Sequence, residues 1–275
     1  MRNHLFAVAL MTLQAAPALS QQPPGLAAAG LEAYQAYKNA PEQRAFAIAP
    51  GGTWGWQGGA DSPDLAEDQA ISACRANTRQ KCVLYARNEK VIFNATAWPG
   101  LWGPYANVTL AAKAPGGIEP GQRMADLGFR DANGKSARLS ALKGKVVILH
   151  FWGSWCPPCR KEMPELASLY KRLADRRDVV FILLQVREPI ETARLWAQSR
   201  QIDLPLADSG SRGESDANLH LANDAPLPDR EVARSFPTSY VLDKHGLVIF
   251  SHVGPVHNWL QYETFLRDAA RNSGK

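Results

Sequence analysis

The chain has 275 residues, of which 45% are hydrophobic and 21% charged, and its formal net charge is +5. This length is sufficient for one large domain or for two smaller ones, each with its own core. Lys and Arg do not gather in runs interleaved with aromatic residues, which argues against nucleic acid as a partner.

The N-terminus has the pattern of a secretory signal peptide. A basic start precedes the apolar stretch 5–13, and the small residues Ala18 and Ser20 suit cleavage after Ser20. An uncleaved membrane anchor is the alternative, but the apolar stretch is shorter than the ~20 residues that a spanning helix needs. We therefore expect residues 1–20 to be removed and the mature protein to be periplasmic, with no stable insertion into a membrane.

Residues 21–112 are predicted to form a small α+β domain. The expected elements are a helix over 31–40, strands over 44–49 and 53–57, a helix over 62–76 and two strands around 87–90. Ser62 is expected to cap the second helix. The aromatic residues of this domain form either a binding surface or a small core. We assign the domain no function.

Two of the four cysteines, Cys74 and Cys82, lie in this small domain. Four cysteines allow three pairings, and the pairing Cys74–Cys82 with Cys156–Cys159 is favoured because each pair is local. A Cys74–Cys82 disulfide would join the end of a helix to the start of a strand and stabilise the fold by roughly 2–3 kcal/mol. The alternative is a second redox pair that passes electrons to the first.

Residues 113–117 are predicted to be a linker, and residues 118–275 a second domain. Its expected elements are a strand over 146–152, a helix towards 173, a strand over 179–186, a helix over 190–200, a hairpin over 239–252 and a helix over 259–271. This alternation predicts an α/β fold with three layers and a mixed central sheet. Residues 208–216 are expected to form a mobile loop, followed by Pro226-Leu227-Pro228 and a short helix that leads into Phe236. The stretch 208–234 either shapes substrate choice or is a plain surface excursion.

The most specific pattern in the chain is Trp155-Cys156-Pro157-Pro158-Cys159, which follows a predicted strand and begins a helix. The partial positive charge at a helix N-terminus stabilises a thiolate. Cys156 is therefore predicted to attack and Cys159 to resolve the mixed disulfide. Pro157 and Pro158 have no N–H to donate to that thiolate, which favours the oxidised form and points to a reductant.

The stretch 133–166, which contains the Cys-Pro-Pro-Cys motif, and the stretch 236–243, which begins Phe-Pro-Thr, together resemble the TlpA/ResA/DsbE (CcmG) group of exported thiol-disulfide oxidoreductases. The resemblance covers about residues 118–272. It implies a thioredoxin-like fold, disulfide-bearing exported proteins as substrates and a DsbD-like electron donor in the inner membrane.

The same resemblance implies that Pro237 is a cis-proline packed beside the cysteines. The backbone of Phe236 would then be free to pair with an extended substrate segment. We expect Trp152 and Trp155 to form an apolar rim around the site. The candidate substrate-binding residues are Trp155, Pro157, Phe236, Pro237 and Thr238.

Glu162 and His150 are the remaining candidate catalytic residues. The resemblance implies that Glu162 lies near the cysteines and tunes their protonation; the alternative is a solvent-facing helical glutamate. His150 stands six residues before Cys156, where thioredoxin has a buried aspartate. It either moves the proton that resolution by Cys159 requires, near its usual pKa of ~6.5, or is a core histidine.

The predicted function is reduction of disulfides in exported partner proteins, for which apocytochromes and copper-site proteins are candidates. We expect no metal and no bound cofactor, because one Cys-x-x-Cys lacks the second ligand pair of a zinc site and Arg160 stands where haem attachment needs histidine. A thiol peroxidase is an alternative, although its motif would need proline at position 149 and threonine or serine at 153, where Leu149 and Gly153 stand. A copper-binding or scaffold protein is another, although the chain has only four methionines.

Overall fold

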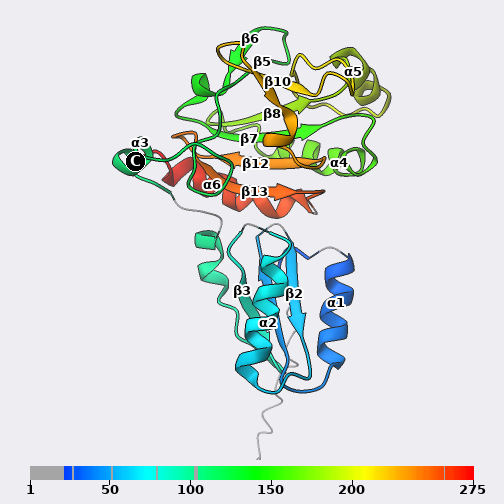
Figure 1. The fold of residues 1–275 in the computed structure, drawn as a ribbon, viewed down its shortest axis with the longest axis vertical. Coiled ribbons are helices and arrows are strands. Elements are labelled where there is room, and N and C mark those ends of the chain that lie inside the picture. The colour runs from blue at the N-terminus through cyan, green and yellow to red at the C-terminus, as the bar shows by residue number, and fades with distance from the viewer. Residues whose placement is uncertain (1–21, 27, 51, 79, 102–104, 257) are drawn as a thin grey trace, which may run out of the picture.

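A computed structural model of the protein describes residues 22–275 apart from 27, 51, 79, 102–104 and 257. They form two units, one with a four-stranded and one with a nine-stranded sheet (Figure 1). The predicted signal peptide, residues 1–20, lies outside the described residues. None of the described helices combines the length and the apolar character that crossing a membrane requires.

The smaller unit is an antiparallel sheet in the order β2-β1-β3-β4 with a helix on each face. Its elements are α1 (Ala28–Asn39), β1 (Ala45–Ala49), β2 (Thr53–Gln57), α2 (Pro63–Arg75), β3 (Val83–Arg87) and β4 (Lys90–Val91). As expected, Ser62 caps α2, since its side chain accepts a hydrogen bond from the backbone N–H of Leu65.

The sequence of β1 explains why both faces of this sheet are covered. Successive strand residues point to opposite faces. Its three alanines pack with α2 and the Cys74–Cys82 disulfide, whereas Phe46 and Ile48 pack with the tyrosines of α1. Trp54 and Trp56 lie against this second, aromatic cluster. These two rings are half-buried and therefore pack at the edge of the core of the small unit.

The larger unit begins with α3 (Val108–Ala112) and contains a mixed sheet in the order β11-β10-β5-β9-β8-β7-β12-β13, with β6 paired to β5. Its strands are β5 (Leu127–Arg130), β6 (Ser136–Arg138), β7 (Val146–Trp152), β8 (Val179–Gln185), β9 (Leu206–Asp208), β10 (Asn218–Leu221), β11 (Pro226–Pro228), β12 (Thr238–Leu242) and β13 (Val248–Val253). Its longer helices are α4 (Pro157–Arg172), α5 (Ile190–Ser199) and α6 (Glu263–Asn272). Strands β7, β8 and β9 run parallel, and β12 is antiparallel to β7. This is the α/β, thioredoxin-like arrangement that the sequence predicts.

Short 3-10 helices account for part of the remaining chain. They are η1 (Ala95–Leu101), η2 (Leu139–Leu142), η3 (Asp229–Glu231) and η4 (Trp259–Tyr262). The last of these shows that the closing helix expected over 259–271 starts as a 3-10 turn and becomes α-helical only at Glu263.

The stretch 208–234 contains strands that the sequence does not indicate. Residues 209–217 form neither helix nor strand, as expected for the loop, and η3 is the expected short helix. Between them, β10 and β11 extend the edge of the large sheet. Strand β11 is Pro226-Leu227-Pro228, and proline is tolerated there because an edge strand has one side that needs no partner. The prolines that suggest a loop in the sequence therefore mark the end of the sheet.

The two units are in contact through the edge strand β13. Gln80, which is buried, donates from Nε2 to the carbonyl oxygen of Ser251 at 3.1 Å. Trp98 packs against the cores of both units. Tyr105 donates to Asp268 at 2.9 Å, so the chain already contacts the larger unit before the expected linker at 113–117.

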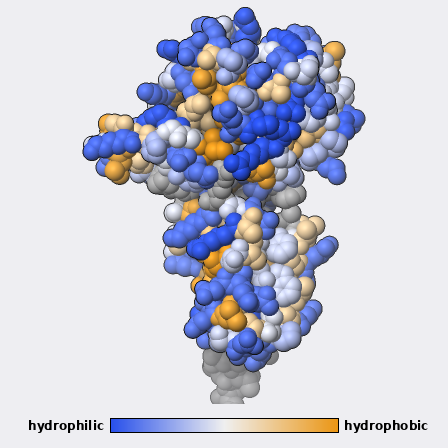
Figure 2. Space-filling model, in the orientation of Figure 1, coloured by the Kyte–Doolittle hydropathy of each residue, from blue (hydrophilic) through white to orange (hydrophobic). Residues whose placement is uncertain are grey.

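Hydrophilic residues cover most of the face shown in Figure 2, and apolar residues appear there as small, separate patches. One such patch lies where Figure 1 places α3. Val108 and Leu110 of this helix are 63% and 62% exposed. Most large apolar side chains are instead buried in the cores of the two units.

Candidate active site

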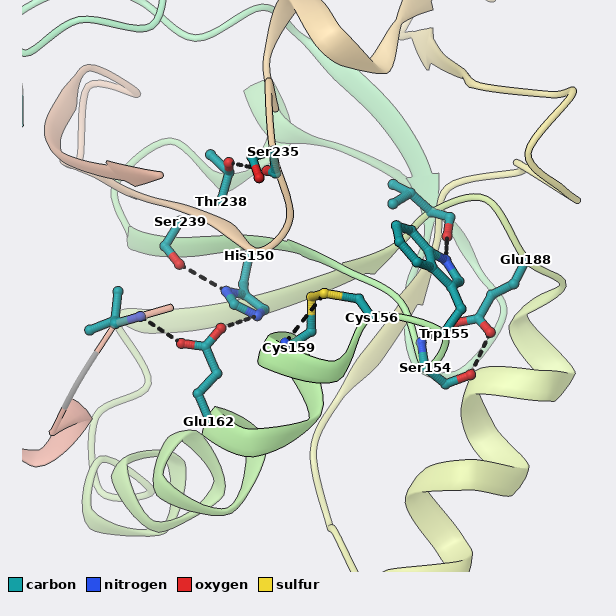
Figure 3. Close-up of a disulfide and its surroundings, with 12 residues drawn as sticks. His150, Ser154, Trp155, Cys156, Cys159, Glu162, Glu188, Ser235, Thr238 and Ser239 are labelled. Atoms are coloured by element: carbon teal, nitrogen blue, oxygen red, sulfur yellow. Dashed lines mark hydrogen bonds and ion pairs between the residues drawn. A yellow bond between two sulfur atoms is a disulfide. The ribbon is translucent and has the colours of Figure 1, made fainter. Parts of the chain in front are cut away.

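The two cysteines of the motif lie where strand β7 gives way to helix α4 (Figure 3). Cys156 is the N-cap residue of α4, Cys159 lies in its first turn, and the two form a disulfide. Cys156 is 3% exposed, whereas Cys159 is fully buried. Although Pro157 and Pro158 have no N–H, the backbone N–H of Cys159 points to Cys156 Sγ at 3.3 Å. The helix N-terminus therefore still offers one amide donor to the sulfur of Cys156.

The peptide bond between Phe236 and Pro237 is cis, as expected from the family resemblance. Thr238 is fully buried and donates from Oγ1 to the carbonyl oxygen of Ser235 at 2.6 Å (Figure 3). Thr238 also pairs with Phe151 of β7, which places this turn next to the strand that leads to the cysteines. The side chain of Thr238 thus holds the turn in place and is not exposed to a partner.

A groove of about 590 Å³ opens beside Cys156. Its apolar lining consists of Trp155, Pro157, Pro158 and Phe236. Its charged lining consists of Arg187, Glu188, Glu214 and Arg230. Three of the five predicted substrate-binding residues, Trp155, Pro157 and Phe236, therefore line one groove with the predicted nucleophile, whereas Pro237 and Thr238 do not.

Trp155 and Trp152 have different roles. Trp155 is 44% exposed, meets the ring of Phe236 edge to face at 5.5 Å and donates from Nε1 to the carbonyl oxygen of Val186. Trp152 is fully buried and packs against Trp196. The expectation that Trp152 lines the site is wrong, because β7 is central in the sheet and all its residues are buried.

His150 and Glu162 come together from β7 and α4. His150 is fully buried, with Nδ1 2.9 Å from Ser239 Oγ and Nε2 3.4 Å from Glu162 Oε1 (Figure 3). Glu162 is only 4% exposed, and its Oε2 accepts hydrogen bonds from Val256 N and Trp259 Nε1 at 2.9 and 3.0 Å. The alternative of a solvent-facing Glu162 is therefore excluded by its burial.

Burial also changes which proton each of these two groups holds. Desolvation raises the pKa of Glu162 to about 8, although the bonds from Trp259 and Val256 lower it in part. Desolvation lowers the pKa of His150 to about 3. At neutral pH the pair is uncharged, with a proton on Glu162 and a neutral imidazole facing it. In this environment His150 does not titrate near its usual pKa of 6.5.

The charged residues that line the groove, and Asp229 behind them, are not among the site residues that the sequence predicts. Arg187 donates to both carboxylate oxygens of the buried Asp229 at 2.6 and 2.8 Å. The guanidinium groups of Arg187 and Arg230 lie 5.4 and 5.2 Å from the centre of the Phe236 ring. Glu188 is buried and bonds to Ser154. No local motif marks Arg187, Asp229 or Glu188, because their hydrogen-bond partners lie 34 or 42 residues away in the sequence.

The chemistry that this arrangement supports is dithiol–disulfide exchange. One sulfur borders an open groove, the other is buried behind it, and a helix N-terminus faces the first. Within the described ranges of the chain, no three His, Cys, Asp or Glu side chains gather as ligands of a metal ion would.

Comparison with known proteins agrees with this chemistry. The model of the AhpC/TSA family matches residues 120–251. The thioredoxin-like protein YneN of Bacillus subtilis (strain 168) is 32% identical over 139 residues, which are 50% of this chain and 74% of YneN. The thiol-disulfide oxidoreductase ResA of the same organism is 30% identical over 132 residues, 48% of this chain and 66% of ResA. ResA of Halalkalibacterium halodurans is 28% identical over 134 residues, 49% of this chain and 68% of that protein.

Solved structures similar to the chain include StoA from Bacillus subtilis, which is 21% identical with a TM-score of 0.38 and covers 52% of this chain and 97% of its own. A thiol:disulfide interchange protein of the thioredoxin family from Chlorobium tepidum TLS is 23% identical with a TM-score of 0.39 and covers 54% of this chain and 97% of its own. Each of these matches accounts for about half of the chain.

Proposed function

Because the chain belongs to the thioredoxin-fold AhpC/TSA family and is a thiol-disulfide oxidoreductase like its ResA relatives, we propose that it reduces disulfides of exported partner proteins. The observation that carries this proposal is the position of Cys156. It caps α4 at the edge of the groove beside the cis Phe236–Pro237 turn, while Cys159 is fully buried.

The reaction proceeds in two exchanges from the dithiol form. The thiolate of Cys156 attacks one sulfur of the partner disulfide, which forms a mixed disulfide and releases one partner thiolate. The thiolate of Cys159 then attacks Cys156 Sγ and releases the second partner thiolate. Two electrons pass to the partner, and the Cys156–Cys159 disulfide remains.

The partner docks as an extended segment in this proposal. The backbone of Phe236, which precedes the cis-proline, pairs with that segment. Trp155 and Pro157 are exposed at the groove and provide apolar contact beside Cys156.

Glu162, with His150 beside it, supplies the proton acceptor for the second exchange. Glu162 lies three residues after Cys159 on α4, so the two side chains share a helix face. The ionised Glu162 accepts the proton of the Cys159 thiol, and His150 holds the carboxyl group in place. His150 itself remains neutral throughout.

The cellular setting is also part of the proposal. The N-terminal pattern supports export to the periplasm, and a DsbD-like inner-membrane protein would return the Cys156–Cys159 pair to the dithiol form. In this proposal the Cys156–Cys159 pair carries the electrons by itself, and the reaction needs no bound cofactor.

The test is reduction of insulin with dithiothreitol as the electron source, which is followed by the turbidity of the released chains. The purified protein should accelerate the reaction, and Cys156→Ser should abolish the acceleration. The Cys74→Ser/Cys82→Ser double variant is the control, since it lacks the other disulfide and keeps the active pair. Equal rates with and without Cys156 would refute the proposal.

A thiol peroxidase does not fit the turn before Cys156. A side chain at Gly153 would place its Cβ 2.2 Å from Trp155 Nε1, so the threonine or serine of a peroxidase motif has no room there. Peroxide consumption in the presence of dithiothreitol should therefore stay at the background rate.

A further inference from the structure

The buried carboxylate of Glu188 is hydrogen-bonded to the turn that leads into the Cys156–Cys159 disulfide. Ser154 lies two residues before Cys156 in the connection between β7 and α4. Its backbone N–H donates to Glu188 Oε1 at 2.6 Å, and its hydroxyl donates to Glu188 Oε2 at 2.5 Å (Figure 3). Both oxygens of one carboxylate are thus used on one residue of the turn.

The same short segment holds the turn at a second point. Trp155 Nε1 donates to the carbonyl oxygen of Val186 at 2.9 Å, two residues before Glu188. The segment 186–188 follows β8, which pairs in parallel with β7. Two adjacent residues of the turn, Ser154 and Trp155, are therefore hydrogen-bonded to the segment that follows β8.

The charge of Glu188 is not balanced by its neighbour in sequence. Arg187 turns its guanidinium to Asp229, to which it forms two hydrogen bonds. Among the described residues, no ion pair within 4.0 Å joins Glu188 to a cation. Glu188 is 6% exposed, so solvent screens its charge less than that of a surface carboxylate.

We propose that Glu188 is a positioning residue for Cys156. The carboxylate of Glu188 holds the turn before Cys156 in place and makes the Cys156–Cys159 pair a stronger reductant. The inference rests on the oxidoreductase activity proposed above. Glu188 and Cys156 border the same groove. A fixed negative charge near a thiol disfavours the thiolate, and a less stable reduced form favours the disulfide.

The other charged residues of the groove bear on the size of this effect. Arg187 and Arg230 favour the thiolate of Cys156, whereas Glu214 disfavours it together with Glu188. Arg187 is paired with Asp229, and Arg230 and Glu214 are exposed. Glu188 differs from these three in being both buried and free of an ion pair with another described residue.

The test compares Glu188→Gln with Ser154→Ala in the full mature chain. The amide oxygen of Glu188→Gln can still accept from Ser154 N, and its NH₂ group can donate to Ser154 Oγ, so the turn is kept and the charge is lost. Ser154→Ala keeps the charge and the backbone hydrogen bond. Glu191→Gln is the matched control, because Glu191 is an exposed carboxylate in the first turn of α5.

The readouts are the pKa of Cys156, from thiolate absorbance at 240 nm, and the equilibrium constant with glutathione. Glu188→Gln should lower the pKa and shift the equilibrium towards the dithiol by roughly three- to tenfold, since one pKa unit is tenfold. Ser154→Ala and Glu191→Gln should not lower the pKa.

Unchanged values in Glu188→Gln would overturn the proposal, and so would an equal fall in Ser154→Ala, which would indicate mere distortion of the turn. If Glu188→Gln does not fold, a lowered pKa in Ser154→Ala still overturns the proposal. Both readouts are independent of insulin reduction, so failure of the proposed function is recognised separately.

Discussion

Nε2 of His150 lies 3.4 Å from Oε1 of Glu162, and both side chains are buried next to Cys159. A strand and the helix that follows it thus bring one base and one acid together in the core. Because burial disfavours both charged forms, the pair is uncharged at neutral pH, with the carboxyl group of Glu162 protonated and the imidazole of His150 neutral. The proton on Glu162 links the stability of the fold to the chemistry of the disulfide.

The first prediction concerns stability against pH. The raised pKa of Glu162 gives stability that is lost as pH rises from its usual value of 4.5 through about 8. The lowered pKa of His150 gives stability that is lost as pH falls from 6.5 through about 3. Between pH 4.5 and 6.5 the two effects on the free energy of unfolding cancel. The pair therefore contributes most to stability in this range, and its contribution does not change with pH there.

Glu162→Gln should remove the decline above pH 6.5, which is at most about 1.4 kcal/mol per pH unit. Urea unfolding at a series of pH values measures this. A parallel decline in wild type and variant would show that another group is responsible.

The second prediction concerns the rate of resolution. Ionised Glu162 accepts the proton of Cys159, so release of the partner from the mixed disulfide should speed up as pH rises through about 8. Glu162→Gln should slow the release by roughly a hundredfold, as expected for loss of a general base. Stopped-flow measurement of mixed-disulfide decay tests this, and an unaltered rate in the variant would remove Glu162 from the reaction.

The third prediction concerns Gly153. A Cβ at this position would lie 2.2 Å from Trp155 Nε1, so Gly153→Ala should displace the indole ring from its bond to Val186. The cost to stability should be about 1–3 kcal/mol. The fluorescence emission of Trp155 should change together with this loss of stability. Its signal is identified by comparison with variants in which single tryptophans are replaced. Crystal structures of both forms with the ring unmoved would contradict the prediction.

The fourth prediction concerns the ion pair between Arg187 and Asp229. Asp229→Asn leaves the guanidinium without its buried partner and should destabilise the protein by about 3 kcal/mol. Since Arg187 also lies over Phe236, KM for a peptide disulfide should rise more than kcat falls. Thermal unfolding and steady-state kinetics measure the two effects. Glu231→Gln, an exposed neighbour, should change neither.

The fifth prediction concerns the disulfide of the small unit. Removal of the Cys74–Cys82 bond should cost roughly 2–3 kcal/mol of stability, because it constrains the unfolded chain. The rate of insulin reduction should remain that of the wild type at temperatures where the variant is folded. A large loss of activity in folded protein would favour the alternative in which this pair passes electrons to the active one.

Features that depend on a local sequence pattern are the ones that the sequence predicts on its own, whereas the cis Phe236–Pro237 turn is expected from the family resemblance. The apolar strand before Cys156 and the cap of α2 at Ser62 are local patterns, and the structure has both. Trp152 is wrongly placed, because its burial depends on the strands that flank β7. Glu188 and Asp229 lie 34 and 42 residues from their partners, and no local pattern reveals such contacts.

The account depends on Cys156 as the attacking sulfur, and the most direct measurement is a trapping experiment. Reduced Cys159→Ser protein is mixed with oxidised insulin, quenched with acid and digested, and the cross-linked peptides are identified by mass spectrometry. The account predicts a mixed disulfide between Cys156 and an insulin cysteine that dithiothreitol releases. Absence of the adduct, or an adduct on Cys74 or Cys82, would contradict it.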